Sequence, residues 1–434
     1  MSNCLRQSAR LLILLLLCHS CRPHTPTATE QQCQSLLKQK DFFRLRTLLA
    51  AAGEDISPEN RRYFEACTDN AFNRNQASDS AIAQLFDGSR HLADSLKANL
   101  LLLKEDNDFK LGQYAQAAEA NKLLLASFWT QLDSSDLDDA RNKALIENGL
   151  VGTPPQQTVF PVDTGTTTIP WQRDPLGLIE IPVYMGDTSV SSIFDTRANI
   201  SSIMESDAKR LGVRMLGVKY KEGSGATGNT FQVALGVADS LRFGNILVRN
   251  VVFQVMPDSI LYIGPPVDFH LHLILGYPVI AQLREVHILR NGSLVIPATP
   301  ASSTLQNLAM SGLDPVLRCR VNQDTLIFGF DTGASSSVFN DNYYHRFEKE
   351  IVRDGQSDSV SSAGAGGSIR QKVTILKEVR LNVGSQTAIL KKISVNNDPL
   401  PNTKELIFGN LGQDLMQQFG ETILNFDSMY IDFK

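Results

Sequence analysis

The 434-residue sequence lacks several features that would assign it to a common functional class. It contains no block of Lys or Arg, and its formal net charge is only -5, so a nucleic-acid-binding surface is not expected. It contains neither a Gly-x-Ser-x-Gly elbow nor a His-Glu-x-x-His helix, which argues against the hydrolases that use those motifs. The chain is nevertheless long enough for two or three domains, each with its own core.

The N-terminal apolar run, Leu11–Leu17, is too short to span a bilayer as a helix. Arg6 and Arg10 precede it, and a positive start followed by a short apolar run is typical of a secretory signal peptide. The run ends near Ser20-Cys21, which resembles a bacterial lipobox. We therefore expect residues 1–20 to be removed and Cys21 to be lipidated, anchoring the protein to a bacterial membrane on the periplasmic or outer side. An ordinary signal peptide with incidental cysteines is the alternative.

Few cysteines follow Cys21, and they are Cys33, Cys67 and Cys319. None of the three belongs to a Cys-x-x-Cys motif or a Cys/His cluster, so we expect no zinc site. In an oxidising compartment Cys33 and Cys67 are candidates for a disulfide between neighbouring helices, or they are two small buried residues. The sequence leaves both possibilities open.

Residues 21–150 are predicted to form an all-α domain of antiparallel helical hairpins, because Leu and Ala recur with helical spacing. The run from Gly112 to Ala117 resembles the opening of the second helix of a tetratricopeptide repeat. Lys40-Asp41-Phe42 resembles a degenerate copy, close to two repeat lengths earlier in the chain. A tetratricopeptide-like domain implies a surface for a protein partner.

The segment 151–175 is predicted to be a linker, and residues from 176 onward are predicted to be mostly β. This β half repeats itself. Each copy has two short strands followed by Asp-Thr, at Asp195 and at Asp331. Each copy then has a Gly-rich hairpin and an apolar-apolar-Gly triplet, ending at Gly276 and at Gly409, so the features recur in order at nearly one period. We therefore predict two lobes, residues 176–300 and 315–434, joined by a linker at 301–314.

The second copy resembles the motif of aspartyl proteases of the pepsin/retropepsin type, Asp-Thr-Gly-Ala/Ser-x-x-Ser. The matching residues are Asp331, Thr332, Gly333, Ala334 and Ser337. The resemblance covers residues 176 to 434 and implies an all-β bilobal acid-protease fold. It also implies that Asp195 and Asp331 form the catalytic pair and that Thr196 and Thr332 brace them.

The chemistry implied by the resemblance needs no cofactor. Two carboxylates about 3 Å apart cannot both ionise, so they share one proton. The ionised carboxylate takes a proton from water while the protonated one donates to the substrate carbonyl oxygen. An extended peptide between the lobes is the expected substrate, recognised partly through its backbone.

The first copy departs from the motif because Arg197 stands where glycine belongs. A guanidinium that points into the cleft and pairs with Asp195 would lower the pKa of this carboxyl and disfavour the shared proton. A guanidinium that points outward would leave the pair able to work, and this is the expected arrangement. A second reading is a degenerate relative that binds peptides or proteins without cleaving them, and a third is a scaffold whose helical domain carries the function.

Three other patterns receive structural interpretations. Asp163-Thr164-Gly165 repeats the first letters of the motif, but no strand-turn-strand precedes it, so it is assigned to the linker or to a leading strand. His270 and His272 have no third ligand at metal-binding spacing and are assigned to a strand. The glycine-rich stretches are interpreted as hairpin tips that form flaps over a substrate cleft rather than as a dinucleotide site, since a strand follows the first of them. Their glycines are Gly223, Gly225 and Gly228 in the first copy and Gly364, Gly366 and Gly367 in the second.

Overall fold

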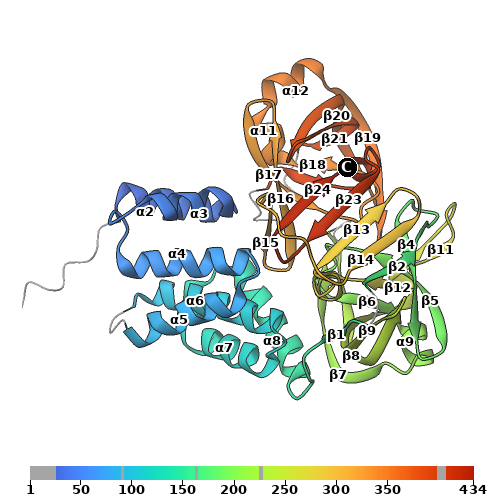
Figure 1. The fold of residues 1–434 in the computed structure, drawn as a ribbon, viewed down its shortest axis with the longest axis horizontal. Helices are drawn as coiled ribbons and strands as arrows, with labels where there is room; N and C mark the ends of the chain where they lie inside the picture. Colours follow the sequence, from blue (N-terminus) through green and yellow to red (C-terminus); the bar gives the residue numbers. More distant parts are fainter. Residues whose placement is uncertain (1–25, 89–91, 162–164, 224–227, 398–406) are drawn as a thin grey trace, which may run out of the picture.

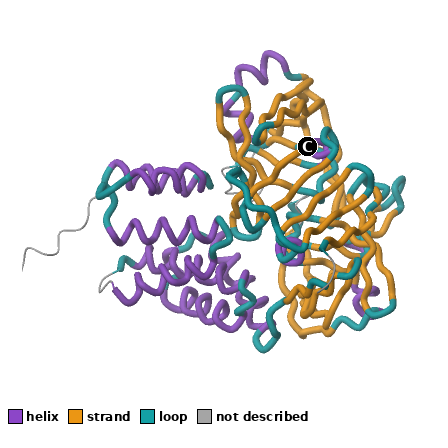
Figure 2. The backbone as a smooth tube through the Cα atoms, in the orientation of Figure 1, coloured by secondary structure: helices purple, strands orange, loops and turns teal. Residues whose placement is uncertain are grey.

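The computed structural model describes residues 26–88, 92–161, 165–223, 228–397 and 407–434. Cys21, Asp163 and Gly225 lie outside the described residues, so the predictions made for them stay predictions. The helices of residues 28–150 lie on one side of the molecule, and the strands, with a few short helices among them, lie on the other (Figure 2). This arrangement confirms the predicted fold class, a helical N-terminal region followed by a mostly β domain.

The helical region is an array of antiparallel helices (Figure 1). Its helices are α2 (Ala28–Lys38), α3 (Phe42–Ala51), α4 (Pro58–Ala71), α5 (Asn75–Gly88), α6 (Asp94–Lys110), α7 (Tyr114–Ser127) and α8 (Ser134–Leu150). Side chains at the N-caps fix several of the starts, because they accept from backbone N–H groups that the helix itself leaves unpaired. Thr27 and Glu30 form a capping box at α2, and Asp41, Ser57 and Asp133 cap α3, α4 and α8.

The two segments that resemble tetratricopeptide repeats occupy equivalent turns. Lys40 and Gly112 both have a positive φ, 56° and 69°, just before α3 and α7 begin. This left-handed conformation reverses the chain between two antiparallel helices. The shared turn agrees with a helical-hairpin array, while membership of the repeat family stays a prediction.

Cys33, Cys67 and Cys319 are all buried free thiols. The disulfide that the sequence left open is therefore not formed in this structure. None of the described helices is both long enough and apolar enough to cross a membrane.

The β half contains one large sheet in each lobe and a third sheet between them (Figure 1), and a small sheet of β10 (Tyr262–Ile263) and β11 (Phe269–His270) in lobe 1. The lobe 1 strands include β4 (Ile179–Met185), β5 (Thr188–Phe194), β6 (Ser201–Met204), β7 (Arg214–Gly223), β8 (Thr230–Phe243), β9 (Ile246–Met256) and β12 (Leu273–Leu275). The lobe 2 sheet is formed by β15 (Leu308–Ser311), β16 (Asp314–Val321), β17 (Asp324–Phe330), β18 (Val338–Phe339), β19 (Gln356–Gly364), β20 (Gly367–Val383), β21 (Gln386–Asn396) and β22 (Gly409–Leu411).

The third sheet joins strands that are far apart in the sequence. It has the order β2 (Thr166–Pro170), β14 (Ser293–Pro297), β13 (Glu285–Leu289), β23 (Glu421–Asn425), β24 (Tyr430–Phe433). The segment 151–175, predicted as a linker, is therefore partly strand, because it contains β1 (Gln157–Val159), β2 and β3 (Gln172–Arg173). These strands pair with β9, β14 and β4, partners that local sequence does not indicate. The predicted inter-lobe linker 301–314 is likewise partly strand, because it contains β15, which pairs with β16.

The helical region packs directly on lobe 1 through α8 and β7. Asn142 on α8 makes two hydrogen bonds to the backbone of Lys221: its Nδ2 donates to the carbonyl oxygen at 2.6 Å, and its Oδ1 accepts from the N–H at 2.9 Å. Near the end of α8, Gly149 faces Val218 and Leu235, and a Cβ at Gly149 would lie 2.8 Å from Val218 Cγ2. The absence of a side chain at Gly149 therefore lets the helix approach the sheet closely.

We predict that Gly149→Ala destabilises the protein by about 1–3 kcal/mol, because the added methyl group overpacks the α8–β7 contact. The matched control is Gly88→Ala at the end of α5, where a Cβ meets nothing within 4 Å. Helix propensity alone makes the control neutral or stabilising by up to about 1 kcal/mol. Denaturant unfolding of both variants measures the difference, and equal effects would contradict the close packing described here.

Candidate active site

Asp195 and Asp331 occupy equivalent positions at the ends of buried strands. Asp195 follows β5, and its N–H donates to the Leu275 carbonyl of the parallel strand β12 at 3.0 Å. Asp331 follows β17, and its N–H donates to the Leu411 carbonyl of the parallel strand β22 at 2.9 Å. In both lobes the strand that follows the hairpin therefore returns to lie beside the aspartate loop.

The supporting glycine of lobe 2 is Gly412, so the prediction of Gly409 was wrong. Gly276 and Gly412 each donate their N–H, at 3.0 Å, to a serine hydroxyl, from Ser201 and Ser337 respectively. A Cβ at either glycine would collide with the backbone of the aspartate loop. The interval from Gly276 to Gly412 is the same as the interval from Asp195 to Asp331, so these two glycines are the equivalent pair.

Thr196 and Thr332 hold the two loops together with reciprocal hydrogen bonds. Each backbone N–H donates to the other threonine's hydroxyl, at 3.0 Å and 3.1 Å. Each hydroxyl in turn donates to a carbonyl of the opposite lobe: Thr196 to Phe330 at 3.0 Å, and Thr332 to Phe194 at 2.6 Å. Both threonines are buried, so all four bonds lie in a water-poor environment.

The two carboxyl groups meet over the loop backbones. Asp195 Oδ1 accepts from the N–H groups of Arg197 at 2.8 Å and Ala198 at 3.2 Å, and Asp331 Oδ1 accepts from Gly333 N–H at 2.8 Å. A Cβ at Gly333 would collide with the Asp195 carboxylate. The glycine of the lobe 2 motif is therefore required by the close approach of the opposite aspartate.

Burial and the neighbouring Asp331 carboxylate raise the pKa of Asp195 to about 8. The N–H groups of Arg197 and Ala198 act in the opposite direction, and the guanidinium of Arg197 does so least. Asp195 therefore holds a proton through the acidic and neutral range. A protonated carboxyl next to a second aspartate is the arrangement that a shared-proton pair requires.

The Arg197 guanidinium reaches into lobe 2. Its Nε donates to Asp314 Oδ1 and its Nη1 donates to Asn410 Oδ1, both at 3.2 Å. Arg197 does not adopt a positive φ, so its backbone does not need glycine. Lobe 1 can therefore hold an arginine at the position where lobe 2 needs Gly333.

The predicted flap hairpins lie in two different settings. Gly223 is the last residue of β7 and Gly228 lies two residues before β8, and strand β7 packs against α8. Gly364 and Gly366 form the tip of the β19–β20 hairpin of lobe 2. The Gly366 N–H donates to the Ile260 carbonyl at 2.9 Å, so this tip bridges to lobe 1.

The histidine pair makes contacts of its own. His272 Nδ1 lies 2.7 Å from Asp207 Oδ2, and the His270 ring lies 4.7 Å from the Tyr262 ring. Among the described residues, no group of three His, Cys, Asp or Glu side chains is arranged to hold a metal ion.

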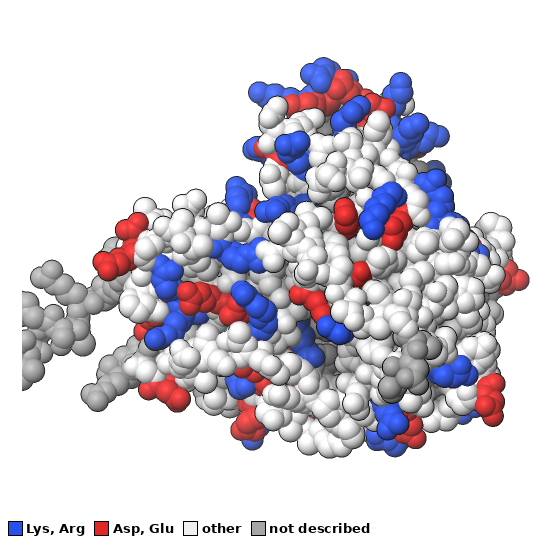
Figure 3. Space-filling model, in the orientation of Figure 1, with Lys and Arg blue, Asp and Glu red and all other residues white. Residues whose placement is uncertain are grey.

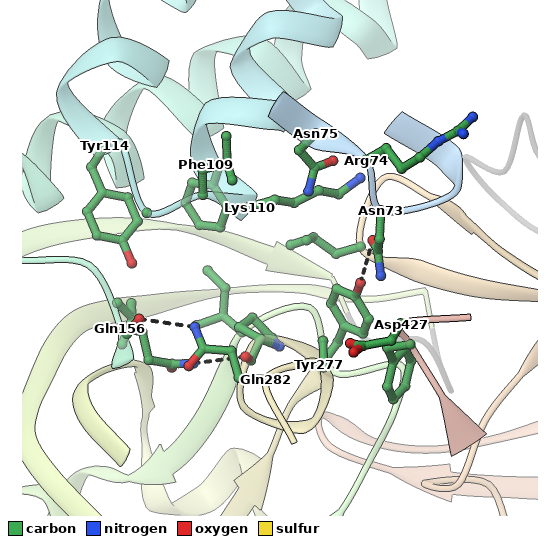
Figure 4. Close-up of a pocket in the computed structure, with 18 of the residues that line it drawn as sticks. Asn73, Arg74, Asn75, Phe109, Lys110, Tyr114, Gln156, Tyr277, Gln282 and Asp427 are labelled. Carbon is green, nitrogen blue, oxygen red and sulfur yellow. Dashed lines mark hydrogen bonds between the residues drawn. The ribbon is translucent and has the colours of Figure 1, made fainter. Parts of the chain in front are cut away.

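A cavity of about 450 Å³ lies where the helical region meets both lobes (Figure 4). It is lined by Tyr114 of α7, by Tyr277 and Gln282 of lobe 1 and by Asp427 of lobe 2. The Tyr277 hydroxyl donates to Asn73 Oδ1 at 3.1 Å across it. Neither aspartate of the pair lines this cavity, so we assign the candidate chemistry to the loops and not to the cavity.

Sequence reasoning missed Asn410, which donates from Nδ2 to Asp331 Oδ2 at 2.7 Å. The repeat could have identified Asn410. It lies as far after Ile274 in the chain as Asp331 lies after Asp195, so the two residues are equivalent in the two copies. Ile407-Phe408-Gly409 fits the apolar-apolar-Gly pattern, whereas Asn410-Leu411-Gly412 has a polar residue at the first position.

A family model described as aspartyl protease matches residues 181–279, which run from β4 to the helix after Gly276. No curated protein matches the chain. Among solved structures, basic 7S globulin from soybean is 13% identical, with a TM-score of 0.40, over 62% of this chain and 95% of that chain. Conglutin gamma, a basic 7S globulin from lupine seeds, is 11% identical, with a TM-score of 0.41, over 63% of this chain and 95% of that chain. The matched segment contains Asp195, so the chain carries an aspartyl protease-like domain.

We predict that Thr332→Val lowers the free energy of unfolding by about 2–4 kcal/mol, because it leaves the Thr196 N–H and the Phe194 carbonyl buried without partners. The matched control is Thr332→Ser, which keeps the hydroxyl and loses one methyl group, at a cost of about 1 kcal/mol. Chemical denaturation distinguishes the two variants. Equal losses would mean that the hydroxyl contributes nothing beyond packing.

Proposed function

We propose that this protein is an aspartic-type endopeptidase in which Asp195 and Asp331 activate water. The observation that carries the proposal is the reciprocal Thr196–Thr332 bonding, which holds the two aspartate loops together at the junction of two lobes. The raised pKa of Asp195 supports it, since one proton is then retained on the pair.

The proposed reaction uses this one proton in two steps. The ionised carboxylate takes a proton from water as the water oxygen bonds to the peptide carbon, and the protonated carboxyl gives its proton to the carbonyl oxygen. The carbon–nitrogen bond of the resulting tetrahedral diol then breaks. One diol hydroxyl returns its proton to a carboxylate, and the departing amine receives the proton held by the other carboxyl. The pair ends with the single proton with which it began.

We propose an extended, unstructured peptide as the substrate, lying between the lobes. A backbone-reading site suits this substrate, because an extended chain exposes its N–H and carbonyl groups to strand edges and hairpins. The β19–β20 hairpin, whose tip bonds to Ile260 of lobe 1, is the element of lobe 2 that we propose to cover such a peptide.

A degenerate, non-cleaving binder is the second candidate, and the observation that favours it is Arg197 in place of glycine. The contacts of Arg197 weaken this argument for a non-cleaving binder. Its guanidinium bonds to Asp314 and Asn410 in lobe 2, and of the groups named above it lowers the pKa of Asp195 least.

We further propose that the protein acts at a bacterial membrane through a lipid on Cys21 and that the helical region binds a protein partner. Acidic and basic side chains are interspersed over the face seen in Figure 3, including the helical region. A mixed surface of this kind suits a protein partner better than a polyanion.

We predict that the wild-type protein cleaves an unfolded protein such as denatured casein and that Asp331→Asn lowers the rate by about 10²- to 10⁴-fold. Asp195→Asn should do the same, while both variants remain folded. Because the raised pKa of Asp195 keeps the required proton bound at lower pH, the wild-type rate should fall as pH rises past about 8. Fragment release measured by mass spectrometry from pH 3 to 9 gives the profile. A wild-type protein that cleaves nothing over this range, yet retains casein as well as Asp331→Asn does, would establish the binder instead.

We predict that Cys21→Ala moves the protein from the membrane fraction to the soluble fraction, because one diacylated cysteine supplies the anchor. Cys33→Ala is the control, since Cys33 is buried in the helical core and should leave fractionation unchanged. Cell fractionation followed by mass spectrometry of the N-terminal peptide tests this. An unmodified N-terminus in the membrane fraction would contradict the lipid anchor.

A further inference from the structure

The two lobes differ beneath their aspartates in a correlated way. In lobe 1, Ile193 of β5 pairs with Ile274 of β12. At the equivalent positions of the repeat in lobe 2 stand Gly329 of β17 and Asn410 of β22, which also pair. A Cβ at Gly329 would lie 2.8 Å from Asn410 Oδ1 and 2.9 Å from Arg197 Nη1. The missing side chain at Gly329 thus makes room for an arginine from one lobe and an amide from the other.

Arg197 fixes the orientation of the Asn410 amide. A guanidinium can only donate hydrogen bonds, so the atom of Asn410 that faces Arg197 Nη1 must be its oxygen. The NH₂ group then faces Asp331 Oδ2 at 2.7 Å, where it can only donate. Asp331 Oδ2 must therefore offer a lone pair to Asn410.

The two carboxyl groups are consequently not equivalent. Both oxygens of Asp331 accept hydrogen bonds: Oδ1 from the Gly333 N–H, and Oδ2 from Asn410. Asp195 accepts at Oδ1 from two N–H groups, and no hydrogen-bond donor in the described part of the chain reaches its Oδ2. Hydrogen bonds donated to a carboxylate favour its ionised form.

We propose that Asn410 is a positioning residue that keeps Asp331 ionised, so that the proton of the pair resides on Asp195 Oδ2. This assignment rests on the proposed function and specifies it further: Asp331 takes the proton from water, and Asp195 donates to the substrate carbonyl oxygen. Arg197 acts through Asn410, since it holds the amide in the one orientation that presents NH₂ to Asp331.

The other charged groups around the pair agree with this assignment. Asp195 faces Asp331 across the lobes, and a negative Asp331 disfavours a second negative charge there. Asp314, at the start of β16, is paired with Arg197 Nε. Asp414, after Gly412, is engaged by the N–H and hydroxyl of Ser337. The carboxylates of Asp314 and Asp414 are thus bonded to Arg197 and Ser337 and not to Asp195 or Asp331.

The first test locates the proton without relying on activity. In the wild-type protein carrying ¹³C-labelled aspartate carboxyl carbons, Asp195→Asn and Asp331→Asn assign the two signals. At pH 6, Asp331 should show a carboxylate chemical shift and Asp195 that of a protonated acid. The reverse assignment would overturn the proposal. A protein that cleaves nothing would refute the proposed function, yet these signals would still decide where the proton lies.

The second test removes the donor. Asn410→Leu should move the acidic limb of the kcat/KM profile to higher pH by about one unit, because Asp331 loses a hydrogen bond that favours its ionised form. It should lower kcat more than it raises KM.

Asp314→Asn is the control, because it removes a charge from the same cluster and leaves the bond between Asn410 and Asp331 in place. Its acidic limb should stay where it is in the wild type. Equal behaviour of the two variants would mean that the cluster only joins the lobes and would overturn the proposal. If Asn410→Leu does not fold, the carboxyl signals of the wild-type protein decide the question alone.

Discussion

Four buried hydrogen bonds between Thr196 and Thr332 and the strands beneath them hold the two lobes of this protein in register. Each threonine satisfies a backbone N–H and a backbone carbonyl of the opposite lobe, and neither group has water as an alternative partner. Loss of one hydroxyl leaves two polar groups unpaired, so the contact forms as a unit. The approach of Asp195 to Gly333 and the raised pKa of Asp195 both depend on this contact, since it fixes how closely the loops meet.

Around this symmetric contact the two lobes differ at several positions whose side chains contact one another. Arg197 replaces the glycine of the lobe 1 motif, and its guanidinium occupies space that Gly329 leaves open beside Asn410. A partly buried guanidinium between the lobes needs acceptors, and Asp314 and Asn410 supply them. The arginine that departs from the motif is therefore packed against lobe 2. The Asn410 amide connects it to Asp331, because it bonds to both residues.

The helical region is part of the same packed body. Phe43 and Phe72 belong to the apolar core that also contains Phe194 of lobe 1 and Phe330 of lobe 2. The guanidinium of Arg318 in β16 lies over the Phe43 ring at 4.7 Å. On the other side, Asn142 and Gly149 of α8 bind the lobe 1 hairpin that includes β7. A displacement of the helical region would therefore disturb the packing of both lobes.

Local sequence was sufficient for the features that depend on local chemistry. Turn signals and short apolar runs predicted the mostly β half from residue 176 onward, and helical spacing identified the N-terminal array. The repeated Asp-Thr indicated two equivalent loops, because the motif is contiguous and its chemistry is visible in residue types.

What the sequence did not reveal are contacts between residues that are far apart in the chain. The strand content of 151–175 depends on β9, β14 and β4 as partners, and Gly412 is identified by its fit beneath Ser336 and Ala334 rather than by its neighbours. The direction of Arg197 was decided by the space beside Gly329, in the other lobe, because a side chain turns toward the room and the acceptors that its surroundings provide.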